Sequence, residues 1–110
     1  METVCVKVKL KSGSLEQVHE WAEELRSRAD EVLATLRDEG VAVESVFLDS
    51  TDEGDFLIYY VKARSIEAAG ELVQRSVHPI DTYHQQFKTD TWEARTPLEV
   101  LIDFENFADY

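Results

Sequence analysis

The residue types best suited to chemistry occur together in one segment, where His78, Asp81 and His84 follow one another at intervals of three positions. Two imidazoles and a carboxylate are sensible ligands for zinc or iron. However, His78 precedes Pro79, which disfavours helical geometry at that residue, so only Asp81 and His84 are expected to be neighbours on a helix. We therefore predict His84 and Asp81 as catalytic residues, with Asp81 holding His84 in one tautomer, and assign no metal site. A helix-start anion at Asp81, or a structural polar cluster, is the alternative interpretation.

A second group of polar candidates lies on predicted strands. Lys7 and Lys9 alternate with valines, and a lysine on a central strand needs water, a cavity or a carboxylate for its ammonium group. One interpretation is a cross-strand ion pair at a subunit interface, because opposite charges stabilise such sheets. The other is a polar pocket for a small organic molecule. The ligand-binding residues predicted by this second interpretation are Lys9, Glu44, Tyr60 and Asp103.

Several reaction classes lack their sequence signatures. Cys5 is the only cysteine, so no intrachain disulfide can form, and we expect a reducing, cytoplasmic environment. The sequence contains no nucleophile elbow, phosphate-binding loop, dinucleotide fingerprint or HExxH motif. We accordingly expect no cofactor. Trp21 and Trp92 are interpreted as packing residues.

Length and charge narrow the possible partners further. The chain has 110 residues, which suits a single domain over 1–110 with its own core. Its 23 acidic and 11 basic residues give a formal net charge of −12, which repels phosphate backbones and anionic membranes. We therefore expect no nucleic-acid or membrane partner. Charge repulsion of this size also suggests a high-salt source, with an acidic protein from an ordinary cytosol as the alternative.

The spacing of apolar residues predicts the order strand, helix, strand, strand, helix, short helix, strand. A capping box at Ser14 begins a long helix whose apolar residues recur at steps of three and four until Gly40. Pro79 begins the short helix, because its fixed φ suits a first helical position. The strands are predicted at Thr3–Lys11, Val41–Leu48, Phe56–Val61 and Leu98–Glu105, and the second helix between Ser65 and His78.

This order predicts an α+β fold, a ferredoxin-like βαββαβ sandwich with an extra short helix before the last strand. Right-handed crossovers place both long helices on one face of the sheet and leave the first and third strands central. The opposite face, with Cys5, Lys7 and Lys9, would expose aromatic neighbours to water. We expect a second copy of the chain to cover it, so that the two sheets of a homodimer form an α/β barrel.

The sequence also resembles a family of short uncharacterised bacterial and archaeal proteins in the dimeric α/β-barrel superfamily, over nearly its whole length. The residues that carry this resemblance are Val8–Lys11 with Gly13, Trp21, Glu39-Gly40, Glu44-Ser45, Phe47-Leu48, Tyr59-Tyr60, Ile80–His84 and Leu101–Asn106. The resemblance implies the fold and a barrel made by two sheets, but no activity, since proteins of this fold include cofactor-free monooxygenases, haem-degrading enzymes, mutarotases and stress proteins.

Two functions follow from these observations. The first is a homodimer whose polar barrel cavity binds or transforms a small organic molecule, in the manner of a cofactor-independent monooxygenase or an isomerase. There His84 serves as base or hydrogen-bond donor. The second is a non-enzymatic dimeric binding or stress module, in which the charged sheet residues form an interface salt-bridge network. A cluster of His84, Tyr60 and a lysine around a void favours the first, and pairing of Lys9 with Asp103 or Glu105 favours the second.

Overall fold

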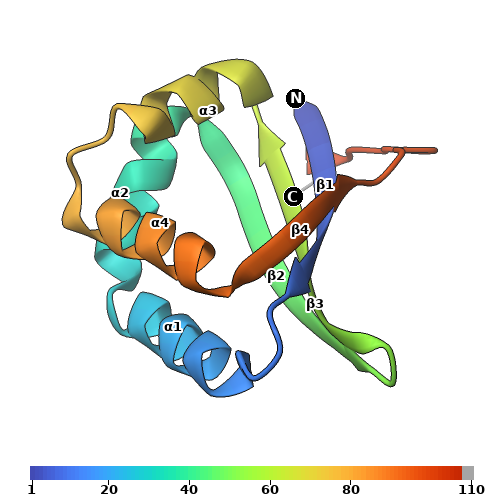
Figure 1. Ribbon diagram of the computed structural model, residues 1–110. Coiled ribbons are helices and arrows are strands. Elements are labelled where there is room, and N and C mark those ends of the chain that lie inside the picture. Colours follow the sequence, from blue (N-terminus) through green and yellow to red (C-terminus); the bar gives the residue numbers. More distant parts are fainter. Residues whose placement is uncertain (108–110) are drawn as a thin grey trace.

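The computed structural model describes residues 1–107 and has the predicted α+β, ferredoxin-like architecture, with four helices covering one face of a four-stranded antiparallel sheet (Figure 1). The strand order β2-β3-β1-β4 places the first and third strands at the centre, as expected. None of the helices in the described part is long and apolar enough to cross a membrane. The elements are β1 (Glu2–Leu10), α1 (Leu15–Ser27), α2 (Ala29–Glu39), β2 (Val41–Thr51), β3 (Gly54–Ala63), α3 (Ile66–Gln74), α4 (Pro79–Thr91) and β4 (Trp92–Pro97).

The core lies between this sheet and the helices. Alternation along β1 turns Val6, Val8 and Leu10 inward, and all three are buried. Leu57 on β3 is only 1% exposed and belongs to the same cluster. Trp21 from α1 closes the cluster from the helix side.

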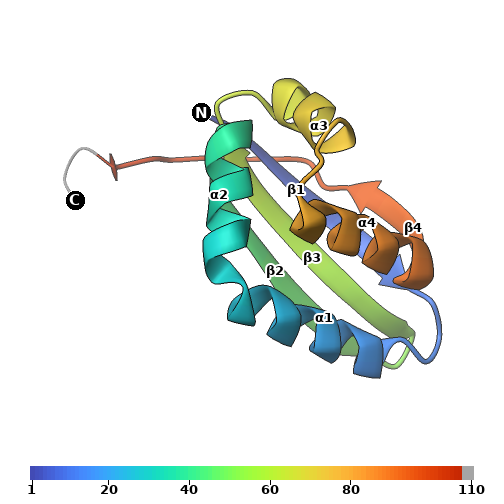
Figure 2. The same cartoon turned by 90° about the vertical axis from the view of Figure 1, so that its left-hand side faces the viewer.

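The long helix predicted from Ser14 to Gly40 is in fact two helices, which meet at an angle (Figure 2). Arg28 leaves helical geometry, with φ −114° and ψ 35°. The Ser27 hydroxyl donates to the Glu24 carbonyl at 2.8 Å, and such a bond competes with the helical ladder. The Arg28 guanidinium also contacts Glu24 and Glu31, at 3.5 and 2.7 Å. A single non-helical residue therefore separates the two helices. The break cannot be predicted from the spacing of apolar residues, because that spacing continues on both sides of Arg28.

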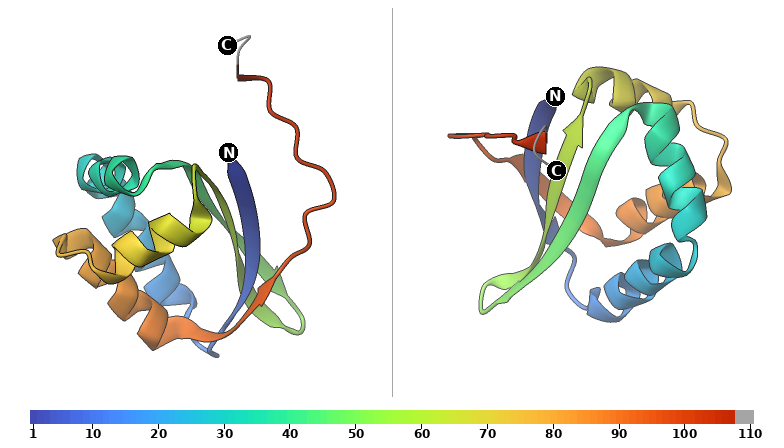
Figure 3. Two further views of the ribbon diagram at one scale, coloured as in Figure 1. Left: turned by 90° about the horizontal axis from the view of Figure 1, so that it is seen from above. Right: turned by 180° about the vertical axis from the view of Figure 1, so that it is seen from behind.

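The last strand was predicted wrongly at Leu98–Glu105, because β4 is formed by Trp92–Pro97 directly after α4. As an edge strand, β4 is largely solvent-exposed and polar, so it lacks an alternating apolar signal. The extra helix α4 is also longer than expected, with 13 residues. Residues 98–107, named here the C-terminal arm, continue from β4 along the side of the sheet opposite the helices and then extend away from it (Figures 2 and 3).

The face of the sheet opposite the helices carries a mixture of apolar and charged side chains. Phe47 on β2 is 59% exposed, and the Lys7 ammonium lies 4.4 Å from the centre of the Phe56 ring. Lys62 also lies on this face, but it is buried because the C-terminal arm covers it. Its Nζ donates to Asp103 Oδ1 at 2.8 Å and to Thr3 Oγ1 at 2.6 Å. No helix of the described chain covers this face, which we call the open face (Figure 1).

Candidate functional site

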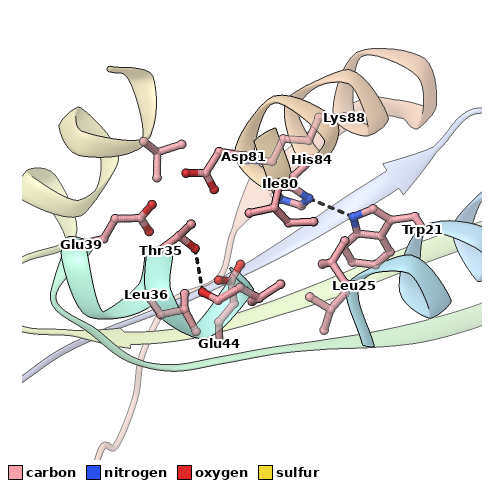
Figure 4. Close-up of a pocket in the computed structure, with 13 residues that line it drawn as sticks. Trp21, Leu25, Thr35, Leu36, Glu39, Glu44, Ile80, Asp81, His84 and Lys88 are labelled. Carbon is pink, nitrogen blue, oxygen red and sulfur yellow. Dashed lines mark hydrogen bonds between the residues drawn. The ribbon is translucent and has the colours of Figure 1, made fainter. Parts of the chain in front are cut away.

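A pocket of about 180 Å³ opens between the helix layer and the sheet (Figure 4). All four helices and β2 contribute to it, so its walls come from segments far apart in the sequence. One part of the wall is aliphatic and another part carries titratable groups. The residues that line it are Trp21, Leu25, Val32, Thr35, Leu36, Glu39, Glu44, Val46, Val73, Ile80, Asp81, His84 and Lys88.

Helix α4 supplies three of the polar groups. Asp81, His84 and Lys88 follow one another at steps of three and four residues, so they share the side of the helix that faces the pocket. Pro79 occupies the first turn, and His78 has extended geometry just before it, as the proline predicts. The imidazole of His78 lies away from the pocket and contacts Asp38 at 3.1 Å.

The tautomer of His84 is fixed by a tryptophan. The indole Nε1–H of Trp21 donates to His84 Nδ1 at 3.0 Å, and the indole ring stacks on Phe87 with 4.4 Å between ring centres. Burial, together with the nearby charge of Lys88, lowers the pKa of His84 to about 3. Neutral His84 must therefore carry its proton on Nε2, which makes the ring a hydrogen-bond donor through that atom. Asp81 instead accepts a hydrogen bond from the Ser76 hydroxyl.

Two carboxyl groups of the pocket have raised pKa values. Loss of hydration, together with the charges of Asp81 and Glu44, raises the pKa of Glu39 to about 7. The pKa of Glu44 is raised chiefly by loss of hydration in the crowded pocket, and Lys88 opposes this effect. A carboxyl group with a pKa near 7 can accept and release a proton at neutral pH, so Glu39 has the property of an acid-base catalyst.

Two further polar atoms lie behind these groups without a partner. Tyr59 Oη and Trp92 Nε1 are buried and have no hydrogen bond within residues 1–107, and their rings meet edge-on with 5.2 Å between centres. The Tyr59 ring is 6.3 Å from that of His84. Burial, with the charge of Glu44, raises the pKa of Tyr59 and keeps it neutral.

The sheet separates the predicted site residues into two sets. Glu44, Asp81 and His84 line the pocket together. In contrast, Lys9 pairs with Glu93 on β4 at 3.3 Å, and the side chains of both are about half exposed.

The other two residues predicted to bind ligand also lie on the open face. Asp103 is bonded to Lys62, and Tyr60 borders a hollow with Lys62 and the C-terminal arm. Opposite faces of one sheet cannot contact the same small molecule, so the structure does not bring these three residues to the pocket.

Three pocket residues, Lys88, Trp21 and Glu39, were not predicted from the sequence as site residues. Lys88 could have been found, since it is one helical turn after His84. Trp21 gave only a packing signal. Glu39 ends α2, and nothing in its local sequence indicates that the bend at Arg28 brings it opposite Asp81. Among residues 1–107, no group of three or more His, Cys, Asp or Glu side chains is placed to hold a metal ion.

Solved structures share this fold at low sequence identity. L-rhamnose mutarotase FA22100 from Formosa agariphila has a TM-score of 0.65 and 21% identity, covering 96% of this chain and 100% of that one. A putative antibiotic biosynthesis monooxygenase from Nitrosomonas europaea has a TM-score of 0.58 and 15% identity, covering 93% and 100%. Another antibiotic biosynthesis monooxygenase has a TM-score of 0.59 and 19% identity, covering 96% and 100%. Identities this low establish the common fold alone.

Sequence comparison gives the family. No curated protein matches the sequence. The family described as "Family of unknown function (DUF6176)" matches residues 1–109, nearly the whole chain. The protein therefore belongs to this family, DUF6176.

Proposed function

We propose that the pocket binds a small, uncharged hydroxylated carbonyl compound, such as a reducing sugar, and catalyses its isomerisation by proton transfer. The observation that carries this proposal is the meeting of Glu39, a carboxyl group with a pKa of about 7, and His84, an imidazole held as a donor, in one pocket. The similarity in fold to a mutarotase is consistent with it.

The charge of the pocket favours an uncharged ligand. Glu39, Glu44 and Asp81 bring three carboxyl groups, whereas Lys88 is the only cationic side chain in the lining. A ligand with a carboxylate or phosphate group would meet like charges in a poorly hydrated space, which is unfavourable. Hydroxyl groups, in contrast, can donate to carboxylates and accept from His84 Nε2–H.

The size and polarity of the pocket fit a molecule with one polar and one apolar side. Its volume of about 180 Å³ is many times the roughly 10 to 15 Å³ that a single water molecule needs in a cavity, so a small organic molecule can enter it. Leu25, Leu36 and Val46 supply the apolar wall. Such a lining suits a small ring or a short carbon chain with hydroxyl groups on one edge.

The proposed reaction on a cyclic sugar is ring opening and reclosure. Glu44 accepts the proton of the anomeric hydroxyl while the bond from that carbon to the ring oxygen breaks, and Glu39, the carboxyl group with a pKa of about 7, gives its proton to the ring oxygen. His84 Nε2–H donates a hydrogen bond that orients the substrate. Reversal of these transfers on the other face of the carbonyl gives the second anomer and restores both carboxyl groups. General acid-base catalysis of this kind contributes about 10²- to 10⁴-fold in rate.

Exchange NMR on a panel of uncharged aldoses tests the proposal. We expect the protein to accelerate anomer interconversion of at least one sugar, and Glu39→Gln to remove most of that acceleration. Lys9→Gln is the matched control, because Lys9 lies on the open face and pairs with Glu93 outside the pocket. The same rate with and without protein for every sugar, or full activity of Glu39→Gln, would refute the proposed reaction.

We also propose that two copies of the chain pair through the open face. This pairing would support the second function, that of a dimeric binding module. Phe47 is well exposed on this face, and the C-terminal arm exposes Leu101, Ile102 and Phe104 by 82%, 76% and 90%. Apolar surface of this extent is typical of an interface. The pairs Lys9–Glu93 and Lys62–Asp103 already form within one chain, so they could enter an interface without unpaired charge.

Sedimentation velocity measures this pairing directly. We expect a dimer that Phe47→Asp weakens about tenfold or more, since the new carboxylate would be buried without a partner. Leu33→Asp is the control, because Leu33 is 49% exposed on the helix layer. A monomer at all concentrations would refute the pairing.

A further inference from the structure

We propose that Lys88 is a nucleophile, whose Nζ forms an imine with the carbonyl carbon of the ligand. Lys88 lines the pocket beside His84, on the side of α4 that faces the other titratable groups (Figure 4). The choice of ligand rests on the proposed function, which requires a carbonyl compound. The covalent step goes beyond that function and can fail or succeed independently of it.

The surroundings of Lys88 differ from those of the other four lysines. Lys9 and Lys62 form ion pairs with carboxylates, and Lys11 Nζ donates to the Thr89 carbonyl at 3.0 Å. Lys7 lies on the open face, over an aromatic ring. Within residues 1–107, Lys88 Nζ has no hydrogen bond and no carboxylate within 4.0 Å. Its contact is the ring of Trp92, 4.9 Å away. It is therefore the lysine that is inside the pocket and free of a polar partner.

Compared with bulk water, the surroundings of Lys88 favour the neutral amine over the charged ammonium group. Burial lowers its pKa, and this effect outweighs the opposing charge of Glu44. Each unit by which a lysine pKa falls raises the fraction of neutral amine at pH 7.5 about tenfold. The neutral amine is the form that attacks a carbonyl group, and lysines of buried pockets are activated in this way.

The pocket also contains the proton-transfer groups that the step needs. Attack of Nζ on the carbonyl carbon forms a carbon-nitrogen bond, and the carbonyl oxygen takes up a proton to give a carbinolamine. In that first step the nitrogen gives one proton to a carboxylate. The hydroxyl then leaves as water with a second proton from a carboxylic acid, and the remaining proton on nitrogen passes to a carboxylate to leave the neutral imine. Glu44 and Glu39 have raised pKa values and line the same pocket, so either can supply and later recover a proton. Amine and aldehyde thus give imine and water, with no oxidant or reductant consumed.

Reductive trapping tests this assignment on the unaltered protein. The probe is glycolaldehyde, a small uncharged hydroxyaldehyde, added with cyanoborohydride, which reduces an imine to a stable secondary amine. Peptide mass mapping then gives the rate of modification at each lysine. We expect Lys88 to react at least tenfold faster than Lys11 at pH 7.5. Modification of Lys88 no faster than Lys11 overturns the proposal.

The internal comparison needs no substitution, so it does not depend on the folding of a variant. Lys88→Arg adds a second measurement, because arginine keeps the positive charge over Trp92 but cannot form an imine. We expect this variant to lose the fast phase of labelling while Lys7, Lys9 and Lys11 react as before, and a retained fast phase overturns the proposal. Accelerated anomer exchange without labelling of Lys88 would overturn the imine alone, and labelling without accelerated exchange would overturn the isomerisation alone.

Discussion

Replacement of Glu39 by glutamine should make the protein more stable at pH 8 but not at pH 4.5. The folded state raises the pKa of this carboxyl group from 4.5 to about 7. Between these values the folded state holds a proton that the unfolded state has lost, so the stabilising contribution is complete below pH 4.5 and is lost as the pH rises to about 7. Glutamine has no proton to lose and avoids this cost.

The size of the effect follows from the same values. A difference of about 2.5 units corresponds to roughly 3.4 kcal/mol, at 1.36 kcal/mol per unit. Because Glu39 is only partly buried, water screens the ionised carboxylate, and we expect about 1 to 2 kcal/mol at pH 8. Glu39→Gln should therefore raise the free energy of unfolding by that amount at pH 8 and change it little at pH 4.5.

Urea unfolding at the two pH values measures this difference. Removal of any acidic group from a chain of net charge −12 relieves some repulsion, so the control is Glu23→Gln at an exposed position of α1. The difference between the two variants isolates the pocket. Equal effects of Glu39→Gln at pH 4.5 and pH 8 would show that this carboxyl group is ionised normally, and the assignment of Glu39 as a proton-transfer group would be wrong.

Three further outcomes are expected. Trp21→Phe removes the donor to His84 Nδ1 and should lower the free energy of unfolding by roughly 1 to 3 kcal/mol. The ¹⁵N NMR spectrum of His84 should then change from that of the Nε2–H tautomer to that of a mixture of tautomers, and an unchanged spectrum would contradict the role given to Trp21. Leu57→Ala should cost about 2 to 5 kcal/mol in denaturant unfolding, against under about 0.5 kcal/mol for the exposed Leu33→Ala, and similar losses would contradict the described core. Added KCl should raise the melting temperature by screening the net charge of −12, and a constant melting temperature would refute that explanation.

Elements with a buried face were predictable from the sequence. The alternating valines of β1 and the apolar stripe of the first helix each report directly which side is buried, and both faces were assigned correctly. The edge strand β4 and the C-terminal arm show the opposite case. Alternation of apolar residues indicates an extended segment with one apolar face. It does not indicate whether the segment pairs with the sheet of its own chain.

The site was predictable only where one helix carries it. Asp81 and His84 share a face because of their spacing, and the structure places both at the pocket. Glu44 and Lys9 lie on different strands, where a shift of one position moves a side chain to the opposite face, and Asp103 lies in the C-terminal arm beyond the last strand. Their separation by the sheet depends on strand register, and for Asp103 on a segment that leaves the sheet altogether.

Because of the bend at Arg28, two separate helices supply different walls of the pocket. Helix α1 carries Trp21, which holds His84, whereas α2 carries Thr35, Leu36 and Glu39 on the far wall. A change in the tilt of α2 about this joint would widen or narrow the pocket while the imidazole and its tryptophan stay in place. Substitutions at Arg28 should therefore change the width of the pocket without replacing any residue that lines it.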